Sequence, residues 1–376
     1  MKTSARWYGR GLALLLALWL SWSGNLIQGQ AAGQAKDGPG TSPQEIAAVC
    51  RAIDWLHTQQ LPDGGFGQRS PALSAGKLSG GGYRSSAGAT ADVVYVLALL
   101  GENPAGPRWT INGRSAMDAL ATLAPGYVNA DAGQAGKVAS AVALTGRNPR
   151  AFAGIDLIKI IQDSYDAKTG RYHPLYEFRH TLAVEGLLRS GVPVPPAALD
   201  VLFQAQLPDG GWFWSFDGQK SDVDTTGRVL QVLAGAAKRQ NAAAYGRAAD
   251  LLARSQLAEG GWNVGYRVGP ANANSTAMAV GGLWAAGLDP QGSRFQRNAA
   301  ESRAFGGSAF PTNKGRGALD ALMGFQEWSG AFAYIRQAGQ EEVRLLATTD
   351  ALGALAPRVA GRLDCRRSGG ALFFWK

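Results

Sequence analysis

The sequence is poor in the residues that bind metals. Only two cysteines and three histidines occur among its 376 residues. The histidines, His57, His173 and His180, stand in different contexts, and no cysteine accompanies them at a ligand spacing. Protein zinc sites draw mainly on Cys and His at short, characteristic spacings. We therefore predict no metal site, and no motif indicates another cofactor.

Signals for two common kinds of chemistry are also missing. There is no Gly-x-Ser-x-Gly elbow for a nucleophilic serine, and no Gly-rich strand-to-helix loop of the phosphate-binding type. Glycine itself is abundant, with 51 residues. The Gly-Gly pairs follow predicted helices, so they indicate turns.

Runs of one charge are absent. The net charge is +9, but Lys and Arg occur singly, with acids between them. Nucleic-acid-binding surfaces cluster their basic residues, so we expect a mildly basic surface and no nucleic-acid partner. Beyond the N-terminal region every apolar run is broken by Gly or charge, so no transmembrane span is predicted in the mature chain.

Residues 1–35 have the pattern of a secretory signal. Basic residues precede the apolar run 11–20, and small residues follow it. That run is too short for a comfortable membrane span, although the apolar character continues past Trp22 and leaves a retained N-terminal anchor as an alternative. We expect a secreted or extracytoplasmic protein with a polar leader at 36–42.

The two cysteines, Cys50 and Cys365, lie near opposite ends of the mature chain. In an exported protein they can pair as a disulfide. The alternative is a buried thiol in the first helix and an unrelated thiol in the tail.

A two-helix pattern repeats along the chain. It begins at Ser42, where a capping residue is followed by Pro43 and, three residues after the cap, by Glu45. Apolar residues then recur at helical spacing. The second helix of each pair ends about every 45 to 50 residues, and a sixth copy comes late, at Thr348. The predicted ends are Gly101, Gly146, Gly191, near Ala237, and Gly287.

The first helix of each pair ends in a common phrase of Gln, then Gly four residues on, then an aromatic two beyond. Glycine accepts the positive φ that ends a helix, Gln can satisfy exposed backbone groups, and the aromatic can bury a large face between hairpins. We expect Trp212 and Trp262 to be such packing wedges. The copy at Asp166 has Asp for Gln, and the copy near Tyr127 is degenerate. The full copies are Gln60-Gly64-Phe66, Gln206-Gly210-Trp212, Gln256-Gly260-Trp262 and Gln326-Gly330-Phe332.

One hairpin cannot bury its apolar faces alone. About six in succession can close into a ring of inner and outer helices, which removes the exposed ends of a solenoid. We predict an all-α fold, an α/α toroid over residues 43–361, followed by a tail at 362–376. Closure would bring Cys50 and Cys365 together.

The segments QLPDGGW, SQLAEGGW and QQLPDGGF resemble the Gln-Trp repeats of the squalene cyclase, oxidosqualene cyclase and prenyltransferase superfamily. The resemblance covers roughly residues 43 to 360 and implies an α/α toroid. It implies no single function, because the superfamily includes cyclases, protein prenyltransferases, thioester-containing complement domains and cobalamin carriers. The thioester motif and the zinc ligands of prenyltransferases are absent here.

The stretch DVDTT, beginning at Asp222, resembles the acid motif Asp-x-Asp-Asp-Thr of class II terpene cyclases. Carried over, Asp224 is the proton donor and Asp222 its neighbour. Thr225 replaces the third Asp, and a second carboxyl is a standard means of keeping a donor protonated. The favoured alternative is that these residues start a helix, which stabilises ionised Asp. The segment at Asn272 supplies the same capping chemistry without an acid.

We look for function at one end of the ring, because the loops leading into the inner helices combine aromatic and polar residues, as ligand pockets do. We predict that the protein binds a hydrophobic small molecule or a partner protein there without catalysis. The alternative is a terpene-cyclase-like or glycan-acting enzyme that uses Asp224 and Asp222. In the family that the motif resembles, class II cyclisation is expected in a cavity between two α-domains, and this chain has residues for one ring. The predicted binding residues are Trp214, Phe216, Tyr83, Arg84, Tyr266 and His180, and the same loops carry Arg267.

Overall fold

The structure is a computed structural model. The predicted signal, Tyr83 and the tail beyond Cys365 lie outside the described residues. None of the described helices is both long and apolar enough to cross a membrane. The described residues are 41–67, 72–74, 77–79, 84–129, 131–236, 241–297, 316–335 and 344–365.

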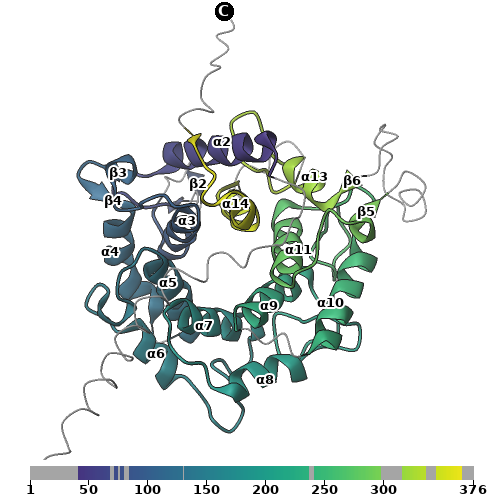
Figure 1. The fold of residues 1–376 in the computed structure, drawn as a ribbon. Coiled ribbons are helices and arrows are strands. Elements are labelled where there is room, and N and C mark those ends of the chain that lie inside the picture. Colours follow the sequence, from purple (N-terminus) through teal and green to yellow (C-terminus); the bar gives the residue numbers. More distant parts are fainter. Residues whose placement is uncertain are drawn as a thin grey trace, which may run out of the picture. The chain divides into compact units, whose positions relative to one another are not determined.

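The described helices alternate between an outer and an inner layer (Figure 1). The inner helices are α3 (Ala87–Leu99), α5 (Ala132–Leu144), α7 (Glu177–Arg189), α9 (Val223–Gly235), α11 (Ala273–Ala285) and α14 (Arg344–Val359). The outer helices are α2 (Pro43–Gln59), α4 (Ala116–Val128), α6 (Leu157–Asp163), α8 (Pro196–Gln204), α10 (Ala242–Ser255) and α13 (Ala318–Met323).

In the described part of the chain, the connections contain three antiparallel two-stranded sheets and three short 3-10 helices. The strand pairs are β1 (Ala72–Ser74) with β2 (Lys77–Ser79), β3 (Thr110–Ile111) with β4 (Arg114–Ser115), and β5 (Gln296–Arg297) with β6 (Arg316–Gly317). The 3-10 helices are η1 (Pro107–Trp109), η2 (Pro149–Ala151) and η3 (Ser293–Phe295).

The inner helices contact one another in a closed cycle. Helix α3 packs on α5, α5 on α7, α7 on α9, α9 on α11, α11 on α14, and α14 returns to α3. In Figure 1 the last helix, α14, lies beside the first hairpin. The predicted all-α fold, an α/α toroid of helical hairpins, is therefore confirmed.

The Gln of the repeated phrase joins neighbouring hairpins. In the last hairpin Gln326 Nε2 donates to Ala48 O of the first hairpin at 2.7 Å. The seam that closes the ring is thus bonded in the same way as the other joints. The equivalent bonds, each of 2.8 Å, join Gln60 to Trp109 O, Gln206 to Ala244 O and Gln256 to Phe295 O.

Two separate constraints require glycine in the phrase: a positive φ and the close approach of the next hairpin. Gly330 has a φ of +95°, and a Cβ there would lie 2.3 Å from Arg51 O of the next hairpin. Gly210 has a φ of +101°, and its Cβ would lie 2.4 Å from Arg247 O. Both the left-handed turn and the close backbone approach exclude a side chain.

The aromatic of the phrase is held by a threonine that the sequence analysis did not single out. Thr226 Oγ1 accepts the backbone N–H of Trp212 at 3.0 Å. The Trp212 and Trp262 side chains are fully buried, and the Trp212 indole N–H donates to Leu202 O at 2.6 Å. Their predicted role as packing wedges is confirmed. The same threonine contact is made in other hairpins by Thr90, Thr276 and Thr348.

A disulfide crosses the seam. Cys50 of α2 is bonded to Cys365, which resolves the choice that the sequence left open. Beside it, Arg358 Nε of α14 pairs with Glu45 Oε2 of α2 at 2.9 Å, and both side chains are largely buried. The seam is therefore closed by a covalent bond as well as by packing.

Candidate functional site

The starts of α7 and α9 carry three carboxyl groups, of which Glu177 interacts with Asp222 and Asp222 with Asp224. We call Glu177, Asp222 and Asp224 the acid cluster. The loops that precede the two helices are joined by backbone bonds, from Phe178 N–H to Trp214 O at 3.2 Å and from Phe216 N–H to Leu175 O at 2.9 Å. The cluster is therefore built from two neighbouring hairpins.

Asp222 is the N-cap of α9. Its Oδ1 accepts the Thr225 N–H at 2.6 Å, as Asn272 Oδ1 accepts the Ser275 N–H at 2.8 Å in the next hairpin. The capping alternative is thus observed. Its other oxygen, Oδ2, is buried without a hydrogen-bond partner in the described part of the chain. Burial raises the pKa of Asp222 to about 7, the Thr225 N–H opposes this shift, and the charge of Asp224 adds to it.

Asp224 lies in the first turn of the same helix and is partly buried. Its Oδ1 has no partner among the described residues. Burial raises the pKa of Asp224, and a hydrogen bond with the Ser275 side chain opposes the shift. The helix start was expected to favour the ionised form of both acids, but burial acts against it and raises the pKa of each.

Glu177 is the third acid and was not predicted. It is the first residue of α7, is 1% exposed, and its Oε1 has no partner in the described part of the chain. Burial raises the pKa of Glu177 to about 9, Asp222 adds to the shift, and Arg171 opposes it. A signal was available, because the corresponding first residues of other inner helices are small or apolar: Ala87, Ala132, Val223 and Ala273.

His180 lies in the interior, where it takes the place of the threonine in other inner helices. Its Nδ1 accepts the Tyr172 N–H at 3.1 Å, and its Nε2 lies 2.8 Å from Ala198 O. Burial lowers the pKa of His180 to about 4, so the ring is neutral. Both ring nitrogens are thus hydrogen-bonded. The ring packs against Phe216 in a T-shaped contact with 5.8 Å between the centroids.

Four aromatic rings form a continuous surface beside the acid cluster, which we call the aromatic wall. Tyr176 contacts Trp214 at 5.5 Å between centroids, Trp214 contacts Phe213 at 5.3 Å, and Phe213 contacts Tyr266 at 5.6 Å. Trp214 is 43% exposed and Tyr266 is 37% exposed. The structure therefore brings two predicted binding residues onto one surface. Their binding role stays a prediction.

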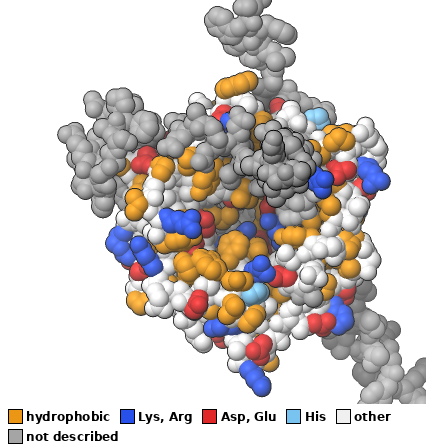
Figure 2. Space-filling model, turned by 180° about the vertical axis from the view of Figure 1, so that it is seen from behind, with side chains coloured by type: hydrophobic (Ala, Val, Ile, Leu, Met, Phe, Trp, Pro, Cys, Tyr) orange, Lys and Arg blue, Asp and Glu red, His pale blue; other side chains and the backbone are white. Residues whose placement is uncertain are grey.

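Arginines flank these aromatic groups. Arg171 stacks over Phe216 at 3.9 Å from the ring centroid, and Arg267 lies 5.5 Å from that of Tyr266. Arg84 is exposed in the segment before α3. Figure 2 shows one end of the ring, where hydrophobic side chains reach the surface among charged ones.

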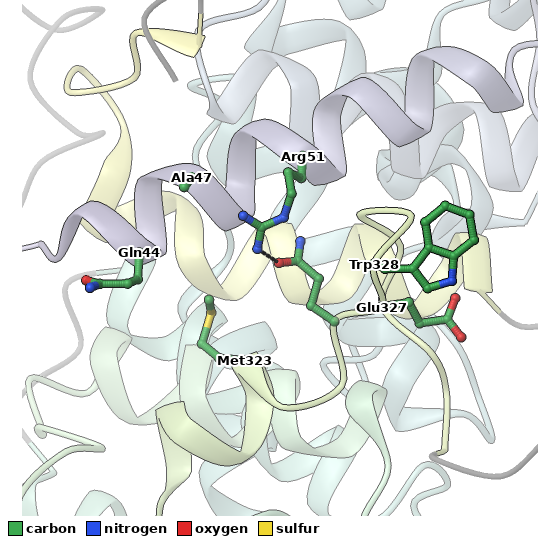
Figure 3. A pocket seen from close by; sticks show the side chains of 7 residues that line it. Gln44, Ala47, Arg51, Met323, Glu327 and Trp328 are labelled. Carbon is green, nitrogen blue, oxygen red and sulfur yellow. Dashed lines mark hydrogen bonds between the residues drawn. The ribbon is translucent and has the colours of Figure 1, made fainter. Parts of the chain in front are cut away.

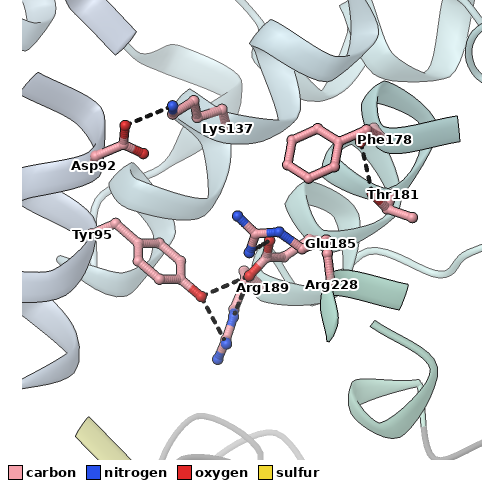
Figure 4. Close-up of polar contacts among 8 residues, drawn as sticks. All are labelled: Asp92, Tyr95, Lys137, Phe178, Thr181, Glu185, Arg189 and Arg228. Carbon is pink, nitrogen blue, oxygen red and sulfur yellow. Dashed lines mark hydrogen bonds and ion pairs between the residues drawn. The ribbon is translucent and has the colours of Figure 1, made fainter. Parts of the chain in front are cut away.

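Charged side chains line the inner helices farther from the helix starts (Figure 4). Glu185 of α7 accepts the Tyr95 hydroxyl of α3 at 2.7 Å and Arg228 Nη1 of α9 at 3.0 Å. Arg189 also donates to the Tyr95 hydroxyl, at 3.0 Å. Although burial alone would raise it, the pKa of Glu185 is lowered by Arg228 and Arg189. This part of the inner face is therefore polar, whereas the aromatic wall is largely apolar.

A second ion pair joins the inner helices α3 and α5. Lys137 Nζ of α5 lies 2.7 Å from Asp92 Oδ2 of α3. Between the inner helices α11 and α14, Asn274 Nδ2 donates to Asp350 Oδ2 at 2.6 Å. Within the described residues, no group of three His, Cys, Asp or Glu side chains could hold a metal ion.

Comparisons with known proteins address the fold. No protein-family model matches the chain, and no curated protein matches its sequence. Among solved structures, the type II terpene cyclase MstE from Scytonema in its apo form is similar, with a TM-score of 0.55 and 14% identity over 85% of this chain and 99% of that chain. A variant of MstE with its substrate, geranylgeranyl dihydroxybenzoate, has a TM-score of 0.54 and 12% identity over 84% and 97%.

A glycosidase variant is also similar, with a TM-score of 0.51 and 14% identity over 86% of this chain and 100% of that chain. At these identities the likeness shows a shared α/α toroid fold and no particular activity. The function must be argued from the site.

Proposed function

We propose that the protein binds an uncharged small molecule between the aromatic wall and the acid cluster, without converting it. One observation carries the proposal. Each of the three clustered acids, Glu177, Asp222 and Asp224, has a buried oxygen with no partner in the described part of the chain. Leaving such atoms unpaired is costly, and a ligand that reaches these oxygens would complete their hydrogen bonds.

The raised pKa values define the ligand chemistry. With a pKa of about 9, Glu177 is a neutral carboxylic acid at pH 7, and a neutral acid both donates to and accepts from hydroxyl, ether or carbonyl oxygens. The site disfavours charge because it is desolvated. Trp214 and Tyr266 offer ring faces for an apolar part of the ligand. We therefore expect an uncharged molecule with an apolar face and at least one such oxygen.

The proposal places the protein outside the cytoplasm. Residues 1–35 have the signal pattern, and the Cys50–Cys365 disulfide suits an oxidising compartment.

Acid catalysis is the second candidate, and the raised pKa of Asp224 favours it. A proton donor must be protonated before it reacts. We prefer binding because Asp222 uses one oxygen as a helix cap and Thr225 stands where the cyclase motif has its third Asp. Asp224→Asn would abolish product formation if Asp224 is the donor, whereas turnover that survives Asp224→Ala excludes this candidate.

Native mass spectrometry of the protein purified from its own host tests the proposal. We expect a mass increment from a bound uncharged compound, lost in a Trp214→Ala variant prepared in the same way. Retention of the compound by Trp214→Ala, or a bare mass for the parent protein together with no thermal shift across a panel of isoprenoids and neutral sugars, would overturn it.

A further inference from the structure

A groove crosses the outer side of the seam between the last and first hairpins (Figure 3). Its volume is about 450 Å³. Trp328 stands at one side and is 97% exposed, and Arg51 lies between it and Met323 in Figure 3. Arg51 Nη2 donates to Gln326 Oε1 at 2.5 Å. We call this the seam groove. It is lined by Gln44, Ala47, Arg51, Met323, Gln326, Glu327 and Trp328.

The repeat does not require a tryptophan at position 328. The turn after Gln326 has a backbone bond from Glu327 N–H to Ala331 O at 2.8 Å, and the turn after Gln206 has the same bond at 2.8 Å. The position of Trp328 is occupied by Pro62, Pro208 and Ala258 in the other full copies. Tryptophan is enriched among the residues that dominate binding interfaces, and here the turn itself does not need it.

The disulfide brings a candidate occupant to this place. Cys365 is bonded to Cys50, the neighbour of Arg51 on α2. The chain continues from there as RRSGGALFFWK, so that Phe373 lies eight residues beyond Cys365. An extended segment of that length reaches about 26 Å. The α2 residues that line the groove, from Gln44 to Arg51, span about 10 Å along the helix.

We propose that residues 371–375 of this chain dock in the seam groove, with their aromatic side chains packed against Trp328 and Met323. The covalent attachment through the Cys50–Cys365 disulfide favours this segment over a free partner. A flexible linker of a few residues gives an effective concentration in the millimolar range, so a free partner with equal contacts competes poorly.

Hydrogen exchange of the full chain and of a chain ending at Ser368 tests this docking. We expect peptides covering 44–51 and 322–330 to exchange at least several-fold faster in the shortened chain. The turn after Gln206, which has the same backbone bond, serves as the internal control. Adding a synthetic GGALFFWK peptide restores the protection in the shortened chain and fails to do so when Trp328→Ala is also present.

A second variant guards against misfolding of the shortened chain. Phe373→Gly combined with Phe374→Gly keeps the length and must show the same loss of protection. Equal exchange in all forms overturns the proposal. Protection that rises with protein concentration, with a dimer in native mass spectrometry, also overturns it and assigns the groove to a second copy of the chain.

Discussion

Glu177, the first residue of α7, and Asp222, the N-cap of the adjacent inner helix α9, interact: burial raises the pKa of Glu177, and the charge of Asp222 raises it further. Thr225 stands where the class II cyclase motif has a further Asp. Here a second carboxyl comes instead from the neighbouring hairpin. The pair is therefore a product of tertiary packing between α7 and α9.

Substitutions at Asp222 can separate its role as the helix cap from the effect of its buried carboxyl group. Asp222→Ala removes the bond to the Thr225 N–H, and we expect it to lower the free energy of unfolding by about 1 kcal/mol. Asp222→Asn keeps a capping oxygen, as Asn272 does naturally, and should be close to neutral. Urea unfolding measures both, with Asn272→Ala as the matched control. An Asn variant as unstable as the Ala variant contradicts this account of the cap.

Glu177 should make stability fall as pH rises. Its pKa rises from 4.5 to about 9 on folding, so between these values the folded state holds a proton that the unfolded state has lost. The free energy of unfolding then decreases with pH, by up to about 1.4 kcal/mol per unit from this group. Burial of Asp222 acts in the same direction up to about pH 7.

Denaturant unfolding across pH 5 to 9 checks this prediction. Glu177→Gln should flatten the curve and gain stability relative to the parent as pH rises. Glu185→Gln is the control, because Glu185 is held ionised by Arg228 and Arg189 and its replacement should cost stability at neutral pH. Parallel curves for the parent and Glu177→Gln would refute the raised pKa.

The network on the inner face should be worth several kcal/mol. Glu185→Gln leaves Arg228 and Arg189 without their carboxylate, and breaking a buried pair costs about 3 kcal/mol or more. Tyr95→Phe removes only the hydroxyl bonds and should cost about 1 kcal/mol. The order of the two effects in urea unfolding is the test, and a larger loss for Tyr95→Phe would show that the ion pairs contribute little.

The disulfide should stabilise the seam. It joins residues 315 positions apart, and removing a bond that closes so long a loop costs about 2 to 5 kcal/mol. Unfolding of a Cys365→Ser variant, compared with the parent before and after reduction, measures this. Two free thiols in the protein purified from its own host would contradict the bond itself.

What was predicted from the sequence is local, and what was missed is not. Gly330 and Gln326 have roles set by helix ends and next-hairpin backbones, so a recurring phrase reveals them. Glu177 matters only because α9 places Asp222 beside it, 45 positions along. His180 was predicted to be a binding residue at one end of the ring, yet its ring nitrogens bond to the backbone of Tyr172 and Ala198. Side-chain direction in a degenerate repeat is a tertiary property.

Binding at the aromatic wall is the central claim, and thermal shift with defined probes tests it most directly. The probes are geranylgeranyl dihydroxybenzoate, which has an apolar chain and hydroxyl groups, and neutral oligosaccharides. The account predicts that at least one raises the melting temperature of the parent and of Trp328→Ala, whose tryptophan lies in the seam groove, but not that of Trp214→Ala. An equal shift in Trp214→Ala, or none in the parent, would contradict it.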